Sequence, residues 1–554
     1  MMSFASEAAY MCLLPILIYL FWAILSPVSW KFIRSVSRPW KIISLIFSFL
    51  YLLMASFTEV LKDRFPLPLK IALLMLCFIC CCLLLFRVGT IKLYAPDTAF
   101  QKIGKSPVYA AIIPITLLSI FIISGCFPGV FSSDSMSNWV DVSVNAFSDW
   151  HPVTYLYILK VIQRIFGTPF PLVLLQTLLW ILANQYALYL LEKYSPIKGG
   201  DILYTAFSII MLYSYRALGN IEKDTLWNIG LFLFCIILFD FIKAQESLRW
   251  YKILLFLIAA GIVSTIRHMG NLIVILSLLA LVFYEWKIHG REYKTRMKQV
   301  VSVLLFSIII PILLVNILGS YILHMTPNEN YVKYSVPISM AGAVASKENL
   351  EQEDIEILEE VMPIEKWRDC YDKYYADSLS RTWGAIGEDA LKFRDKDFQK
   401  DILLLNAKFL VKYPVTYLTA YFDMTSIIWE MGTPSDGYEW IPITIYSSAL
   451  DQYPGYSDLQ IKPTFSTTIQ QNFFGISDQI PIWSSICWRG GFSVFVLLVC
   501  SSLLVKKKRA PELLALFPAL LLTVVLFLAN PSQDPRYIDS YHMLMCFFLI
   551  SASS

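Results

Sequence analysis

Charge is scarce in this sequence, because Asp, Glu, Lys and Arg together make up only 16% of its 554 residues. A soluble domain carries about a quarter of such residues, so the scarcity excludes an ordinary soluble protein. Hydrophobic residues reach 57% instead, which is typical of a polytopic membrane protein. The basic residues form no stripe and no nucleic-acid-binding motif, and no nucleic-acid partner is predicted.

Several familiar motifs are also missing. The sequence has no P-loop, no G-x-G-x-x-G after a strand and no G-x-S-x-G, which excludes the soluble nucleotide-binding and acyl-transfer enzymes that depend on them. The N-terminus, MMSFASEAAYMCLLPILIYLFWAILSPV, lacks a basic n-region and an obvious cleavage site. We therefore interpret it as a retained span and not as a signal peptide.

Cysteine is present but does not suggest a metal site. Most of the eleven cysteines lie inside apolar runs such as LCFICCCLLLF, where cysteine behaves as a small hydrophobic residue. Cys370 and Cys487 lie in a more polar region, and the sequence leaves a disulfide between them open. We predict no metal and no cofactor.

Long apolar segments predict about thirteen transmembrane helices, since a spanning helix needs about 20 apolar residues. The candidate segments are 8–27, 42–60, 70–87, 107–126, 169–191, 202–219, 225–243, 250–266, 271–287, 300–322, 490–505, 512–530 and 537–553.

The basic loops 30–41, 86–105, 286–298 and 506–509 indicate the orientation, because Lys and Arg concentrate in cytoplasmic loops. If all four are cytoplasmic, the N-terminus lies outside and the spans alternate. This requires that the segment VTYLYILKVIQRIFG (153–167) does not cross the membrane. Its three polar residues among aromatic and aliphatic ones are typical of a helix that lies in the membrane interface.

This topology places the unusual polar stretches on one side of a cell membrane. They are FPGVFSSDSMSNWVDVSVNAFSDWHPVTY (127–155), RALGNIEKDTLW (216–227), RHMGN (267–271) and NPSQDPRYIDSYH (530–542). Ionisable residues at the membrane boundary are costly unless they face a cavity. Their gathering on one side therefore predicts an extracytoplasmic site.

The long segment 323–489 lies on the same predicted side and indicates a small, mainly helical extracytoplasmic domain. Ile355, Leu358 and Met362 recur at helical spacing opposite a Glu-rich face. Residues 396–430 predict an amphipathic helix that is interrupted before Pro414. The chain thus divides into helices 1–106, a core 107–322 with outer loop 127–168, this domain, and C-terminal helices 490–554.

The residue types on this side suit transfer of a sugar. A carboxylate can act as general base on an acceptor hydroxyl, and Lys or Arg can hold a phosphate as it leaves with its charge. Aromatic residues can stack on sugars or hold a lipid chain. This combination predicts glycosyl transfer from a lipid-phosphate-linked donor whose tail stays in the bilayer.

Seven stretches also resemble a known superfamily. They are FPGVFSSDSMSNW, FSDWHPVTY, IEKDTLW, RHMGNLI, DIEILEEVMPIEKW…YADS, LVKYPVTYLTAYF and QDPRYIDSYHML. With them the chain resembles GT-C-type membrane glycosyltransferases, which include protein O-mannosyltransferases and lipid A aminoarabinose transferases. More narrowly, it resembles an uncharacterised family of integral membrane proteins from Gram-positive bacteria. The likeness covers most of the chain, and the helices in 1–106 are additional.

The resemblance implies a role for each residue that matches. Asp134 is expected to be the general base or to orient the acceptor, and Lys223, Arg267 and Arg536 are expected to bind the donor phosphate. The residues expected to line the same pocket are Asp149, His151, Glu222, Asp224, His268 and Tyr537. Ser135 follows Asp134 where the superfamily usually has a second carboxylate, which leaves the acceptor open.

The main hypothesis is thus a glycosyltransferase that moves a sugar from a polyprenyl-phosphate-linked donor to a cell-envelope acceptor, which is a polysaccharide, teichoic acid, lipid or protein. A transporter or flippase of lipid-linked saccharides is the first alternative, and it predicts polar residues through the bilayer midplane and inverted repeats. A polymerase or ligase of such saccharides is the second, and it would carry an arginine-rich outer loop.

Overall fold

The computed structural model describes residues 6–25, 30–63, 65–90, 107–195, 197, 199–244, 247–289, 294–326, 333–380, 384–433, 453–530 and 532–553. Helices account for 82% of the structure, and the described residues contain no strand. The all-α prediction is therefore confirmed. Most of the predicted basic loop 86–105 lies outside the described residues.

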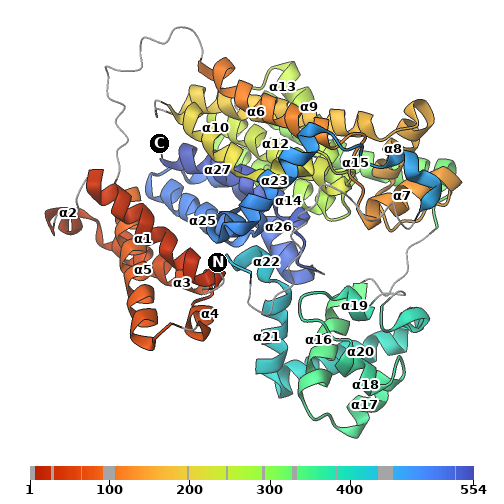
Figure 1. The fold of residues 1–554 in the computed structure, drawn as a ribbon. Helices are drawn as coiled ribbons and strands as arrows, with labels where there is room; N and C mark the ends of the chain where they lie inside the picture. Colours follow the sequence, from red (N-terminus) through yellow and green to blue (C-terminus); the bar gives the residue numbers. More distant parts are fainter. Residues whose placement is uncertain are drawn as a thin grey trace.

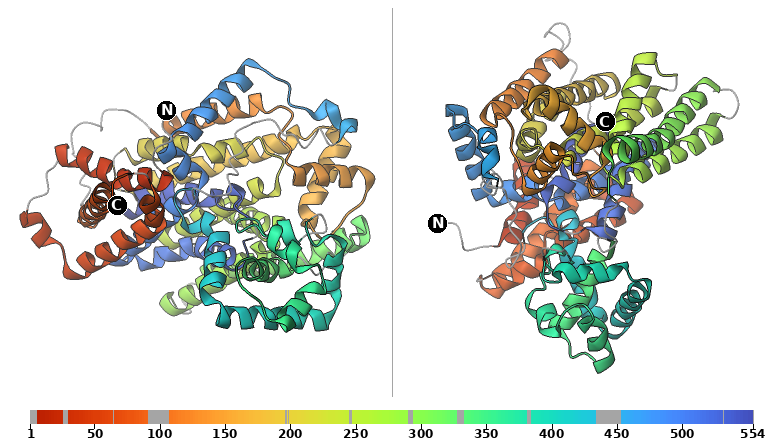
Figure 2. Two further views of the ribbon diagram at one scale, coloured as in Figure 1. Left: turned by 60° about the horizontal axis from the view of Figure 1, so that its bottom comes forward. Right: turned by 90° about the vertical axis from the view of Figure 1, so that its right-hand side faces the viewer.

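Three groups of helices make up the molecule (Figures 1 and 2). The N-terminal group contains α1 (Glu7–Leu25), α2 (Trp30–Ser35), α3 (Arg38–Met54), α4 (Phe57–Lys62) and α5 (Leu67–Val88). In this group α5 packs against α1 and α3, while α1 and α3 also contact the last part of the chain through α24 and α25.

The largest group is the main bundle. Its first part contains α6 (Pro107–Gly125), α7 (Ser133–Val144), α8 (Val153–Phe166), α9 (Phe170–Tyr194), α10 (Gly200–Ile210), α11 (Leu212–Ala217), α12 (Lys223–Ala244), α13 (Trp250–Ile266), α14 (Gly270–His289), α15 (Lys294–Leu313) and the π-helix η1 (Leu314–Leu323). Its second part contains α22 (Ser426–Trp429), η5 (Pro454–Leu459), α23 (Phe465–Gln479), α24 (Pro481–Trp488), α25 (Gly491–Lys506), η6 (Ala510–Glu512), α26 (Leu513–Ala529), η7 (Pro535–Tyr537) and α27 (Asp539–Ser553).

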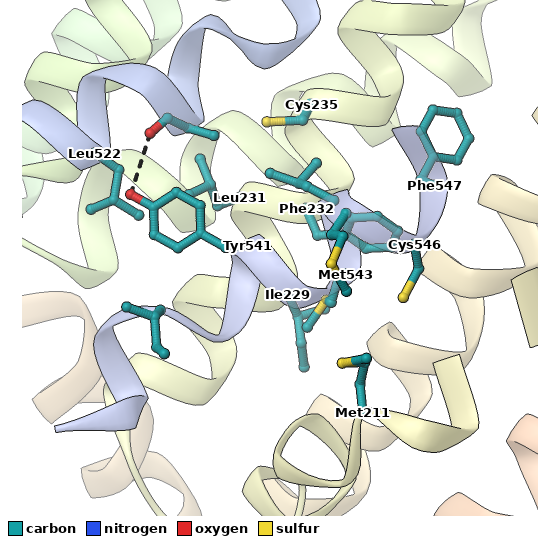
Figure 3. Close-up of a cluster of buried hydrophobic side chains, with 14 of the residues drawn as sticks. Met211, Ile229, Leu231, Phe232, Cys235, Leu522, Tyr541, Met543, Cys546 and Phe547 are labelled. Carbon is teal, nitrogen blue, oxygen red and sulfur yellow. Dashed lines mark hydrogen bonds between the residues drawn. The ribbon is translucent and has the colours of Figure 1, made fainter. Parts of the chain in front are cut away.

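Helix α12 forms the centre of the bundle. Its sequence is apolar on every side, as in a helix with no solvent-facing surface, and all of its apolar window is buried. It packs against α9, α13, α26 and α27. Figure 3 shows side chains from α12 and α27 interleaved in this core, with the Tyr541 hydroxyl 2.9 Å from Thr523 Oγ1.

Within the part of the chain that the structure describes, six helices are long and apolar enough to cross a membrane, and a seventh is counted if α24 and α25, bent by 69°, form one span. The six segments are Leu67–Val88, Phe170–Tyr194, Lys223–Ala244, Gly270–Ile288, Thr295–Leu323 and Ala510–Ala529. The finding supports a membrane protein, but thirteen spans are not confirmed.

Other predicted spans are divided, enclosed by other helices or short in the structure. Segment 42–60 is divided between α3 and α4, because Ser56 adopts a left-handed conformation with φ 56°. Segment 202–219 is divided between α10 and α11 at Met211. Segment 537–553 is the 15-residue helix α27, which is almost entirely enclosed by other helices. Shorter apolar helices of 10–17 residues occupy parts of 8–27, 107–126 and 250–266.

The third group is a compact body within 335–424, here called the 335–424 domain. It contains α16 (Ser335–Lys347), α17 (Gln352–Glu359), α18 (Ile364–Asp369), α19 (Asp377–Ser380), η3 (Gly387–Arg394), α20 (Lys396–Lys412) and α21 (Pro414–Met424). Leu358 and Met362 belong to its own hydrophobic core. Helix α20 ends at Lys412 and α21 begins at Pro414, where the sequence predicts the interruption.

The rest of the predicted segment 323–489 returns to the main bundle. Helix α23 lies along α6, where Gln470 Nε2 donates to the carbonyl of Phe121 over 2.6 Å and Thr467 Oγ1 donates to that of Gly125 over 3.1 Å. Of the two cysteines that a disulfide could have joined, Cys370 is exposed and Cys487 is buried in α24, and neither forms a disulfide.

A buried polar network joins these groups. Arg489, at the end of α24, lies 3.6 Å from Glu430, and their side chains are only 5% and 8% exposed. Glu430 also accepts a hydrogen bond from Ser56 of the N-terminal group. Arg489 Nη1 also donates to Gln533 Oε1 over 3.1 Å. Gln533 Nε2 in turn donates to the carbonyl of Met424, the last residue of α21, over 2.6 Å, so the network joins the loop between α26 and α27 to both other groups.

Candidate functional site

Five segments of the main bundle converge at the beginning of α12. They are the start of α7, the residues before α8, residues 222–224, the end of α13, and the loop between α26 and α27. A short backbone bridge joins the first of these to α12, since Val130 N donates to Gly219 O over 2.8 Å and Ile221 N donates to Val130 O over 2.9 Å. This bridge brings two sequence-distant polar stretches to one place.

Local sequence signals fix the orientation of these side chains. Ser132 caps α7 through a reciprocal capping box with Ser135, which places Asp134 in the first turn. Arg267 has an extended backbone conformation that ends α13. Trp227 Nε1 donates to Val263 O over 3.0 Å and holds α12 against that helix end.

Arg536 is the centre of the charge network. Its Nη1 atom lies 2.9 Å from Asp134 Oδ2 and 3.7 Å from Glu222 Oε1, while its Nε atom lies 2.8 Å from Asp534 Oδ2 and 3.7 Å from Asp224 Oδ2. Four carboxylates from three segments therefore surround one guanidinium. Such charge-assisted contacts restrict its position strongly.

Arg267 forms a second cationic position beside the first. Its Nη1 atom lies 3.2 Å from Asp224 Oδ1, so Asp224 is shared between the two arginines. The guanidinium lies over the Tyr537 ring at 4.7 Å and over the Trp227 ring at 5.3 Å. These cation–π contacts stabilise its orientation toward the network.

Lys223 forms the third cationic position, and its Nζ atom lies 3.2 Å from His151 Nδ1. Burial and the charge of Lys223 lower the pKa of His151 well below its usual value. The imidazole is therefore neutral near pH 7 and can accept a hydrogen bond from the ammonium group.

The carboxylates of the site differ in their proton affinity. Burial opposes ionisation of Asp134, but the charges of Arg536 and Lys223 outweigh it and lower its pKa to about 2. In contrast, burial raises the pKa of Glu222 and of Asp534, although Arg536 offsets part of the effect for both. Asp134 is also the most accessible of the four, with 44% of its side chain exposed.

The structure brings together Asp134, His151, Glu222, Lys223, Asp224, Arg267, Arg536 and Tyr537. Two predicted pocket residues lie outside this group. Asp149 is exposed, and its backbone pairs with Thr326. His268 is exposed and follows Arg267 in the chain, but no contact among the described residues joins it to the network.

Two supporting residues were missed. Asp534 caps η7 by accepting from Arg536 N over 3.0 Å and also pairs with the Arg536 side chain. The Asp-Pro pair in QDPRY, typical of a capped turn, is a signal that could have found it. Asn228 Nδ2 donates to the carbonyl oxygens of Asp224 and Arg536, each over 2.8 Å. No sequence signal distinguishes Asn228 from an ordinary buried polar residue.

The described residues include no group of three or more His, Cys, Asp or Glu side chains arranged to hold a metal ion. The four carboxylates are directed at arginines instead. No protein-family model, curated protein or solved structure matches this chain.

A pH dependence follows from the state of His151. Its pKa is lowered in the folded protein, whereas the unfolded chain takes up a proton below about pH 6.5. Unfolding is therefore favoured as the pH falls below that value, by at most about 1.4 kcal/mol per pH unit. Between pH 7 and 5, we expect the unfolding temperature in detergent to fall more steeply for the wild type than for His151→Gln. Parallel curves would show that His151 is not held neutral.

Proposed function

We propose that this chain is a GT-C-type integral membrane glycosyltransferase. It transfers a sugar from a polyprenyl-phosphate-linked donor to an acceptor of the cell envelope, on the outer side of the cell membrane. One observation supports this above all: Asp134, Lys223, Arg267 and Arg536, from four segments of the chain, meet at one end of the central helix.

The arrangement suits a displacement at the anomeric carbon. The acceptor oxygen forms the new bond to this carbon as the bond to the phosphate oxygen breaks. The acceptor proton passes to Asp134, and the negative charge that develops on the leaving phosphate is stabilised by Lys223, Arg267 and Arg536.

Asp134 gains basicity from its substrate in this scheme. A carboxyl with a pKa of about 2 is a weak base in the empty site. A donor phosphate next to Arg536 offsets the positive charge that holds the pKa down, so the pKa of Asp134 rises when the donor binds. The proton acceptor is thereby activated only when a donor is present.

The charged residues at the two ends of α12 support the proposed orientation of the protein in the membrane, with the site outside. At the end opposite Lys223, Lys243 pairs with Glu512 over 3.2 Å, and Arg509 pairs with the same carboxylate over 2.6 Å. Lys193 and Lys252 pair with Asp240 at that end too. Since basic residues favour the cytoplasmic side, we place the site and the 335–424 domain outside. A topology of about thirteen spans counts, besides the six long helices and the α24–α25 pair, the shorter helices α1, α3, α6, α10 with α11, α13 and α27.

The flippase alternative has less support. A transport path through the bilayer needs polar groups at the midplane, but residues 229–239 of the central helix carry no charged side chain. The polar groups of α12 are instead gathered at its two ends. No described contact favours a polymerase or ligase over a transferase.

Polyprenyl phosphate, the shared product of such donors, provides the test. We expect it to bind the purified protein and raise its unfolding temperature. Arg267→Ala should weaken binding by about 10-fold or more, since charge-assisted hydrogen bonds contribute about 1.5–3 kcal/mol. Arg164→Ala, an exposed arginine of α8 outside the network, serves as the control. Equal affinity in wild type and Arg267→Ala would contradict the phosphate role.

A further inference from the structure

An apolar face remains exposed on the 335–424 domain. Helix α20 buries Phe398, Ile402, Leu405 and Phe409 in the core of the domain. The side chains of its opposite face and of the following helix α21 are exposed, and we call them the apolar stripe: Leu403, Leu404, Leu410, Val411, Val415, Leu418 and Phe422. Val411 and Val415 are exposed by 82% and 77%.

The stripe is regular and not a set of scattered exposed residues. In α20 its members recur at positions i, i+1, i+7 and i+8, with Ala407 between them, so they share one side of the helix. From Val411 the pattern continues at intervals of four, three and four residues through α21. Contiguous apolar surface of this kind marks an interaction site.

The stripe runs into the side of a membrane-spanning helix. The Phe422 ring lies 5.9 Å from that of Phe527 in α26, and the Tyr421 hydroxyl donates to the Phe527 carbonyl. On α26, Val524 and Leu528 are 55% and 63% exposed. Because α26 is long and apolar enough to cross the membrane, these residues face lipid, and the stripe extends the same apolar surface.

Two exposed lysines lie at the other end of the stripe. Lys396 and Lys400 are exposed and lie four residues apart, and Lys400 precedes Leu403 and Leu404 by three and four residues, on the same side of α20. A helix face that combines apolar residues with lysines is typical of helices that lie in the membrane interface, where lysines meet anionic headgroups.

We propose that α20 and α21 lie on the bilayer, with the apolar stripe buried at the boundary between headgroups and acyl chains. The partner is the lipid surface on the same side of the membrane as the site. The backbone bridge between Tyr375 and Ser532 links this domain to the loop that carries Arg536. Contact with lipid therefore also fixes the position of the domain beside the site. A second copy of the chain is the competing partner, but it would have to cover the lipid-facing end of α26 as well.

Site-directed fluorescence tests this placement in the full chain. Cys370, the one exposed cysteine, is replaced by Ser, and a nitrobenzoxadiazole fluorophore is attached to Val411→Cys or Val415→Cys. Glu356→Cys, on the exposed acidic face of α17, is the matched control. In lipid nanodiscs we expect spin-labelled acyl chains to quench the two stripe probes several-fold and aqueous iodide to quench them little, with the reverse at Glu356.

Two results would overturn the proposal. If the stripe probes are quenched by iodide as strongly as the Glu356 probe, the stripe faces water. If they are protected from both quenchers, protein covers the stripe, and a second copy is the partner. The substituted valines are largely exposed, so the variants are expected to fold.

Discussion

Replacing Asp134 with Asn is expected to lower the rate of sugar transfer by about 10²–10⁴-fold, the usual contribution of a general base. The amide keeps the shape of the side chain but cannot accept the acceptor proton. It can still accept a hydrogen bond from Arg536, and 44% of the side chain is exposed. Folding should therefore be little affected. The measurement is transfer from a radiolabelled polyprenyl-phosphate sugar in membranes that contain equal amounts of each protein.

Asp141→Asn is the matched control for this experiment. Asp141 lies in the same helix α7 but has no part in the charge network around Arg536, so normal transfer is expected. Normal transfer in Asp134→Asn with normal expression would show that Asp134 is not the base. A loss of the same size in both variants would indicate damage to α7 instead.

Replacing Arg536 with Gln is expected to lower the rate of sugar transfer by a comparable factor, because the leaving phosphate loses a positively charged partner. Removal of one donor that stabilises developing charge costs about 10²–10³-fold in kcat. The four carboxylates around Arg536 would then repel one another and the donor phosphate, which raises KM as well. Arg536→Lys keeps the charge but cannot reach four partners at once, and it should restore only part of the activity. Separate measurement of kcat and KM distinguishes these effects.

Arg164→Gln controls for the loss of a positive charge near the same end of the bundle, because Arg164 is exposed on α8. A merely structural role for Arg536 would lower expression and unfolding temperature without lowering the kcat of the remaining folded protein. That outcome would remove Arg536 from the proposed chemistry.

The sequence indicated most residues of the charge network around Arg536 but not their pairing. Charged residues at the ends of apolar segments are visible by inspection, and the resemblance to the GT-C superfamily singled out Asp134, Lys223, Arg267 and Arg536 among them. That Asp224 is shared by two arginines depends on how α12, α13 and the loop before α27 meet in space. The exposure of Asp149 could not be foreseen either, since it lies only two positions before the buried His151.

The helix count shows a second limit of sequence patterns. Hydropathy averages over about 20 residues, so it cannot detect a break at a single position such as Ser56 or Met211. It also cannot distinguish a helix that faces lipid from one that faces other helices, as α27 does. Both kinds of segment are equally apolar, because either environment excludes water.

The enclosure of α12 by other helices affects how the protein adapts to membranes of different thickness. Asp224 and Asp240, each paired with basic partners at opposite ends of this helix, are separated by about 24 Å at 1.5 Å per residue. A helix that touches no lipid gains nothing by tilting to match the bilayer. The span between its two ionic ends is therefore constant, and the peripheral helices and the surrounding lipid must accommodate any mismatch.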